Sequence, residues 1–216
     1  MQSSKSEGVV TMLGGRLAVD FANAPSFPGK TSQQLSWEQL ISVLEGSRIV
    51  SQERGAALLS LPESDARAAA ILLARATRLR DALRQLFGAL IRNTSVAPEL
   101  AQPINEILRI TEGHDELVHS EGRWKLTFVA RESGLDWLLA AIARSAAEIL
   151  TEGAAARLSA CANPACGLLF CDTSRTHRRR WCSMAVCGNR YKVASFARRA
   201  PRTFAAKAGS SQAGPG

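Results

Sequence analysis

The chain has 216 residues, of which 46% are hydrophobic and 21% are charged, and its formal net charge is +8. This is the composition of a globular protein, which excludes a chain that is disordered throughout. No apolar run approaches the roughly 18 residues of a transmembrane helix, and the polar segment 1–8 lacks the apolar stretch of a signal peptide, so we expect a cytoplasmic protein with no membrane partner.

Hydrophobic periodicity predicts a mostly helical body over residues 9–156. The apolar segment 17–23 is too short to decide between a strand and a first helical turn. Ser36, with Gln39 three residues on, predicts a capped helix N-terminus. Further helices are expected over 53–61 (ended by Pro62), 63–93, 98–111 and 136–151, and a β-hairpin of 116–120 and 123–129 around Gly122.

The C-terminal part of the chain differs sharply in charge. Residues 1–156 carry 16 Lys and Arg against 18 Asp and Glu, a net charge of −2. Residues 157–216 carry 11 Lys and Arg against a single acid, Asp172, a net charge of +10. We therefore expect a basic module over 157–204 that follows a near-neutral body. The predicted disordered tails are residues 1–8 and 205–216.

All five cysteines lie in this basic module, and four of them form two close pairs. The spacing is Cys161-x4-Cys166-x15-Cys182-x4-Cys187. Two tight pairs joined by a loop can bring four thiolates around one ion, and thiolates favour zinc over Mg²⁺ or Ca²⁺. The sequence therefore predicts one structural Zn²⁺; the alternative is a set of buried or disulfide-bonded cysteines. Cys171 is expected to pack in a core.

The order of elements around the cysteines predicts a treble-clef-like finger. Residues 168–171 read as a strand with 179–181 as its returning partner, and 174–177 lie between them as the turn. A helix is expected to begin near Met184 and to run to about Ala200. The predicted fold class is therefore mainly α, with a small β-hairpin and a C-terminal treble-clef-like zinc finger.

The residues around these pairs resemble the CGNR zinc finger, a family named for the tetrapeptide at 187–190. The matching stretches are Cys161-x4-Cys166-Gly-Leu-Leu-Phe, Asp172-x-Ser174-Arg175, Arg179-Arg-Trp-Cys-Ser-Met184 and Cys187-Gly-Asn-Arg190. Leu17-x-Val19-Asp20-Phe21-x-Asn23 is similar to the opening motif of the ABATE-like domain that usually precedes this finger, a helical domain described as a stress-induced transcription regulator. The resemblance implies DNA binding and transcriptional regulation. Cys171 stands where we would expect an aromatic or aliphatic residue.

The cations of the module point to nucleic acid. A helix beginning near 186 would place its cationic residues on one side and Val186, Val193 and Phe196 on the other, packed on Phe170 and Trp181. The alternative is a solvated basic face or a patch that binds RNA or a protein partner. The predicted DNA contacts are Arg175, Arg178, Arg179, Arg180, Arg190, Lys192, Arg198 and Arg199.

The body gives weaker functional signals. Asp20 and Asn23 are polar residues in an apolar segment, and they could bind a small effector or satisfy buried backbone groups. The sequence contains three histidines and no nucleophile or phosphate-loop motif, so we expect no enzyme. The first hypothesis is a transcriptional regulator that binds DNA, with a body for sensing or homodimerisation. The second is a protein-interaction or scaffold module with a ligand-binding body.

Overall fold

The computed structural model describes residues 12–24, 34–120, 122–131 and 134–199. The body contains α1 (Leu17–Asn23), α2 (Trp37–Gly46), α3 (Gln52–Leu59), α4 (Leu61–Ser64), α5 (Ala66–Ile91), the 3₁₀ turn η1 (Pro98–Ala101), α6 (Gln102–Ile110), β1 (Gly113–Ser120), β2 (Arg123–Ala130) and α7 (Trp137–Glu152). The C-terminal part contains η2 (Gly153–Ala156), β3 (Leu158–Ala160), β4 (Leu169–Cys171), the π-helical turn η3 (Met184–Gly188) and α8 (Asn189–Arg199).

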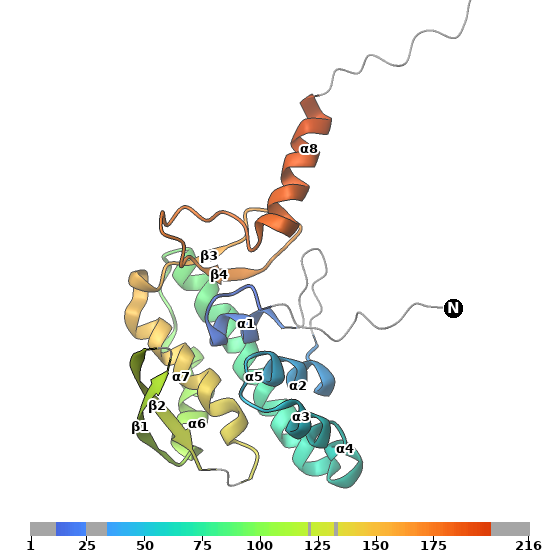
Figure 1. The fold of residues 1–216 in the computed structure, drawn as a ribbon, viewed down its shortest axis with the longest axis vertical. Helices are drawn as coiled ribbons and strands as arrows, with labels where there is room; N and C mark the ends of the chain where they lie inside the picture. The colour runs from blue at the N-terminus through green and yellow to red at the C-terminus, as the bar shows by residue number, and fades with distance from the viewer. Residues whose placement is uncertain (1–11, 25–33, 121, 132–133, 200–216) are drawn as a thin grey trace, which may run out of the picture.

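The long helix α5 is the axis of the body, and α1, α2, α6 and α7 pack around it (Figure 1). Its buried side chains, among them Leu72, Leu79, Leu83 and Leu86, recur at helical spacing and face the core. Segment 17–23 is helical, which answers the question that its length left open. Six of its seven side chains are buried, because α1 lies between other elements of the core. A helix this short depends on that packing for its stability.

The N-terminus of α2 confirms the predicted capping box. The Ser36 hydroxyl accepts the N–H of Gln39, and the Gln39 carboxamide accepts the N–H of Ser36. The prediction for Pro62 was wrong in detail, since α3 already ends at Leu59 and Pro62 lies in the first turn of α4. Proline is tolerated there because the first N–H groups of a helix have no partner within it.

The predicted hairpin is confirmed, and β1 pairs antiparallel with β2. At one end it packs on α7, where the Arg144 guanidinium lies 4.4 Å from the centre of the Phe128 ring and bonds to Asp115 at 3.2 Å. Asp115 and Phe128 are opposite each other in the register, and so are Leu117 and Leu126 further along the same face. The part of the hairpin that contains Leu117 and Leu126 does not reach α7, and these two side chains are 60% and 70% exposed.

The strand pairing in the C-terminal part differs from the prediction. β4 forms where expected, but its partner is β3, which precedes the first cysteine pair, and not residues 179–181. The connection between β3 and β4 is therefore the first cysteine knuckle itself. The hydrogen bond from the Cys161 N–H to the Leu168 carbonyl, 2.8 Å, closes this hairpin. No helix among the described residues combines the length and apolar character needed to cross a bilayer.

Candidate metal centre and basic surface

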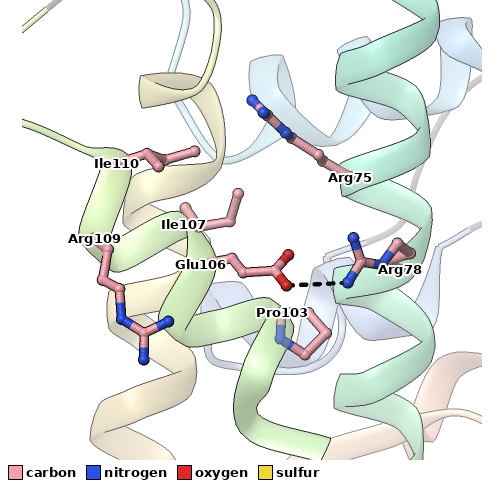
Figure 2. Close-up of a pocket in the computed structure, with 7 residues that line it drawn as sticks. All are labelled: Arg75, Arg78, Pro103, Glu106, Ile107, Arg109 and Ile110. Carbon is pink, nitrogen blue, oxygen red and sulfur yellow. Dashed lines mark hydrogen bonds and ion pairs between the residues drawn. The ribbon is translucent and has the colours of Figure 1, made fainter.

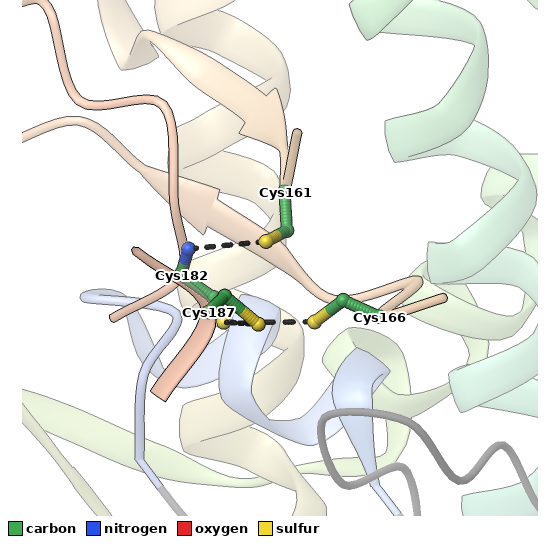
Figure 3. A group of neighbouring side chains, drawn as sticks. All are labelled: Cys161, Cys166, Cys182 and Cys187. Atoms are coloured by element: carbon green, nitrogen blue, oxygen red, sulfur yellow. Dashed lines mark hydrogen bonds between the residues drawn. The ribbon is translucent and has the colours of Figure 1, made fainter. Parts of the chain in front are cut away.

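Four cysteine sulfurs converge in the C-terminal part (Figure 3). The Sγ atoms of Cys161, Cys166, Cys182 and Cys187 all lie within 4.8 Å of one another, and all four side chains are buried. The Sγ of Cys182 is 3.6 Å from those of both Cys166 and Cys187. The two sulfurs of a disulfide are bonded at about 2.05 Å. In a tetrahedral site with Zn–S bonds of about 2.3 Å, neighbouring sulfurs are about 3.8 Å apart. The arrangement fits one structural Zn²⁺.

Local backbone structure builds each half of this centre. Cys161 directly follows β3, and a turn closed by the Cys166 N–H and the Asn163 carbonyl brings Cys166 back beside it. Gly167 has a φ of +67°, which lets the chain leave this knuckle and enter β4. Cys187 lies in η3, where its N–H bonds to the carbonyl of Ser183. The spacing of the cysteines had predicted these knuckles.

Hydrogen-bond donors are also aimed at the sulfurs. The Cys182 N–H is 3.4 Å from the Sγ of Cys161, and the Asn163 carboxamide is 3.5 Å from the Sγ of Cys187. Without metal, burial raises the pKa of the Cys166 thiol to about 11 and raises that of Cys182 as well. Binding of the metal must therefore release protons, and the donors then stabilise the thiolates. Four protein ligands leave no open position for chemistry, which makes the zinc structural.

The metal centre is fastened to the body by Asn23 at the end of α1. Its Nδ2 donates to the carbonyl of Leu169, and its Oδ1 accepts the N–H of Leu169, both at 2.8 Å. The carboxamide thus forms with the main chain of β4 the pair of hydrogen bonds that a neighbouring strand would form. The neighbouring N–H of Cys171 donates to the carbonyl of Gly14 at 2.7 Å. Cys171 lies in the core of the body, apart from the four other cysteines, as expected of a packing residue.

Asp20 and Arg179 both bind the main chain of Leu13 and Gly14, the segment that is hydrogen-bonded to Cys171 in β4. Asp20 is buried, and its Oδ1 accepts the N–H of Gly14 at 2.6 Å. The Arg179 guanidinium donates to the carbonyl of Leu13 at 3.0 Å. Both Asp20 and Asn23 therefore bond to main-chain groups, which is the alternative to the effector site that the sequence left open. The sequence did not identify these partners, because no sequence signal marks the backbone N–H or carbonyl that a distant side chain will meet.

Two family models match consecutive parts of the chain. The CGNR zinc finger matches residues 157–200, and the family described as "Putative stress-induced transcription regulator", ABATE, matches residues 15–153. The chain belongs to the ABATE family. Its C-terminal part is a CGNR zinc finger, and the metal centre described above lies within it. Comparison with curated proteins finds no match.

The fastening of the ABATE domain to the CGNR finger should depend on pH through Asp20. Burial raises the pKa of this carboxyl to about 6, although the N–H groups of Gly14 and Leu13 and the charge of Arg179 lower it. An unfolded Asp titrates near 3.9, so the folded protein binds the proton more tightly. This contribution to stability is complete below about pH 4 and is lost as the pH rises to about 6, on the order of 2–3 kcal/mol.

Urea unfolding of the wild type and of Asp20→Asn from pH 4 to 7 measures this effect. The variant should gain stability relative to the wild type as the pH rises, because an amide stays neutral. Both proteins carry the same finger, so acid effects on zinc cancel in the difference. Glu99→Gln, at an exposed carboxyl, is the control. Parallel profiles for the wild type and Asp20→Asn would contradict the role of this carboxyl.

The loop after β4 carries the exposed cations of the CGNR finger. Arg175, Arg178 and Arg180 are exposed. Asp172 organises this loop, because its carboxylate accepts the N–H groups of Ser174 and Arg179 and the Ser174 hydroxyl. Its hydrogen bond from Ser174 lowers the pKa of the Asp172 carboxyl. Asp172, the one acid of residues 157–216, therefore accepts hydrogen bonds from within the finger. The three arginines around it face outward.

Arg179 does not belong to this exposed set, which corrects the sequence prediction. Its guanidinium donates to the carbonyls of Trp181 and Cys182 as well as to that of Leu13. It also lies 4.4 Å from the centre of the Phe170 ring. These contacts assign Arg179 to the fold of the finger rather than to a phosphate.

The packing of the helical segment of the CGNR finger agrees with the prediction only in part, since Val186 packs against the core of the finger. Arg190 and Lys192 are exposed on α8, as expected, whereas the side chains of Arg198 and Arg199 lie outside the described residues. Val193 was expected to pack on the hairpin, but it is 69% exposed because α8 projects away from the rest of the finger (Figure 1). The side chain of Phe196 is likewise outside the described residues.

The ABATE domain has a pocket between α5 and α6, with a volume of about 270 Å³ (Figure 2). Two of its arginines form ion pairs: Arg78 with Glu106 at 3.2 Å, and Arg75 with Asp136 at the start of α7. These pairs tie α5 to α6 and to α7. The lining residues are Arg75, Arg78, Pro103, Glu106, Ile107, Arg109 and Ile110.

Proposed function

We propose that this protein is a transcriptional regulator that binds DNA through its CGNR finger. The observation that carries the proposal is the charge of residues 157–216, eleven cations against one acid whose carboxylate is used internally. Four zinc thiolates lower this net charge of +10 by two, to about +8. A surface of this kind attracts the phosphate backbone of DNA and releases its counterions.

The geometry of the finger supports this proposal because it fixes the cations in place. The zinc centre anchors η3 and the start of α8, and Asp172 anchors the loop that carries Arg178 and Arg180. Positioned guanidinium groups lose less conformational freedom on binding than groups on a flexible tail. The proposal includes a cytoplasmic location and no catalytic role.

The helical body would supply the regulatory input. The pocket between α5 and α6 has room for a small ligand, which supports sensing. The exposed hairpin residues Leu117, Trp124 and Leu126 offer an apolar face, which supports pairing with a second copy. Light scattering on the purified protein tests the second role, because pairing predicts a dimer and its absence predicts a monomer.

Replacement of Arg178 and Arg180 by Ala should weaken binding to all duplex sequences alike. Each lost phosphate contact makes the negative slope of log K against log salt shallower by about 0.9. The slope of the double variant should therefore be shallower by about 1.8, and the variant should bind DNA about tenfold more weakly. Fluorescence anisotropy with two unrelated duplexes across a salt series measures both quantities. The matched control is Arg67→Ala with Arg92→Ala, which removes the same charge from exposed positions on the body. Equal effects of the two double variants would reject a local role for the loop.

The alternative function is a protein-interaction or scaffold module. A gel-shift series with random duplex DNA, with and without a chelator, separates the two functions. The DNA hypothesis predicts binding that the chelator abolishes, because the metal holds the basic surface together. A wild-type protein with stoichiometric zinc that binds no duplex at low salt would exclude the proposed function and favour the scaffold.

A further inference from the structure

Helix α8 packs mainly against η3, the turn that precedes it. It starts at Asn189, shortly after the zinc ligand Cys187, and projects away from the rest of the finger and from the body (Figure 1). Val193, an apolar residue of this helix, is 69% exposed. An apolar side chain that stays in water on a projecting helix adds nothing to the stability of the fold. Val193 is therefore available for contact with a partner.

One side of this helix, which we call the reading face, is defined by Val186, Asn189, Arg190, Val193 and Ala194. These residues border a shallow open hollow of about 530 Å³ that Ala185 completes. At 100° per residue the four of them that belong to α8 fall within an arc of about 140°, and Val186 adjoins them from η3. The face thus combines small or branched apolar side chains with one carboxamide and one guanidinium, all within the first half of the helix and the turn before it.

Charge decides which partner fits this face. Residues 157–216 carry a net charge of +10, so contact between the α8 helices of two copies would bring two strongly basic segments together. A polyanion is the complementary partner. Duplex RNA offers only a deep, narrow major groove that side chains cannot read, whereas the major groove of DNA, about 12 Å wide, admits a helix. The occupant to which these observations point is duplex DNA.

We propose that the reading face of α8 enters the major groove and reads the edges of the bases. This inference rests on the proposed function and adds sequence recognition to it. Val193 contacts the methyl group of a thymine. The Nδ2 of Asn189 donates to the carbonyl of Ala185 at 3.3 Å, so its Oδ1 accepts a hydrogen bond from a base edge, and the Arg190 guanidinium donates to another. The small side chain of Ala194 lets the helix backbone approach the groove closely.

The flanks of the face fit this placement. The Arg180 guanidinium lies 5.4 Å from the Trp181 ring centre, and the Trp181 ring lies 4.8 Å from that of Tyr191, the residue after Arg190. Arg180 is thereby held beside the reading face, where a phosphate of the groove wall would pass. Lys192 is on the same helix but about 130° from the middle of the face. It provides a matched control for charge without base contact.

The test begins with selection of duplexes from a random DNA library by the zinc-loaded full chain. Affinities for an enriched duplex and for its scrambled version are then measured at one salt concentration. Val193→Ala and Asn189→Ala should each weaken binding to the enriched duplex by about 5- to 100-fold, with little change for the scrambled one. Lys192→Ala should weaken both duplexes equally. Zinc content and far-UV spectra confirm that each variant is folded.

A second measurement isolates the thymine methyl group. Deoxyuridine in place of the contacted thymine should weaken binding of the wild type several-fold and leave binding of Val193→Ala unchanged. The inference fails if Val193→Ala and Asn189→Ala enrich the same motif with wild-type affinity, or if they weaken both duplexes equally. It also fails if the wild type binds duplexes in a salt-dependent way without enriching any motif, in which case the proposed function stands. Absence of binding to any duplex removes both.

Discussion

Replacement of Cys182 by Ser is expected to remove the zinc ion and to unfold residues 157–199. The Sγ of Cys182 lies 3.6 Å from two of the other sulfurs, and its own N–H bonds to the third. Structural zinc contributes about 10–16 kcal/mol to small zinc fingers, which do not fold without it. Zinc content should fall from about one ion per chain to nearly none. Elemental analysis and far-UV circular dichroism measure the two effects.

The matched control for this experiment is Cys171→Ala. Cys171 is also buried, but it lies in the core of the body and not among the four converging sulfurs. This variant should keep its zinc and lose about 1–2 kcal/mol of stability, as is usual for a small change in a core. If Cys182→Ser retained stoichiometric zinc, or if Cys171→Ala lost it, the assignment of the ligands would be wrong.

Replacement of Asn23 by Ala should loosen the finger from the body without removing the metal. The variant leaves the N–H and the carbonyl of Leu169 without the two bonds that Asn23 makes. An unpaired group in a buried site costs about 1–3 kcal/mol, so the free energy of unfolding should fall by about 2–4 kcal/mol. Urea unfolding measures this loss, and hydrogen exchange at the Leu169 amide should become faster.

The control is Asn105→Ala, which removes an exposed asparagine on α6. Zinc content should stay at about one ion per chain in Asn23→Ala, which distinguishes this variant from Cys182→Ser. An unchanged urea midpoint together with unchanged exchange at Leu169 would show that the side chain does not fasten β4 to α1.

Patterns that depend on local chemistry were predictable from the sequence. Ser36 and Gln39 form the expected capping box because both partners lie within one helical turn. The hairpin around Gly122 forms as expected, with β1 antiparallel to β2. The spacing of the cysteine pairs predicted the zinc centre, since each knuckle is formed by a few consecutive residues and the metal joins them.

Features that depend on contacts between distant residues were not predictable. The roles of Asn23 and Arg179 rest on backbone carbonyls 146 and 166 residues away in the chain, and no periodicity marks such groups. For the same reason the sequence assigned Arg179 to the basic surface along with its neighbours. It also paired β4 with 179–181, because β3 has only three residues and no alternating pattern that would mark it as a strand.

The sequence by itself determined the helical body, the four-cysteine centre and the concentration of positive charge in the last quarter of the chain, because composition and short spacings express each of them. The tertiary structure decided which polar residues fasten the two parts, which arginines face outward, and that α8 projects with Val193 exposed. These outcomes depend on where distant backbone groups meet, and such meetings are set by packing of the whole chain rather than by any local pattern.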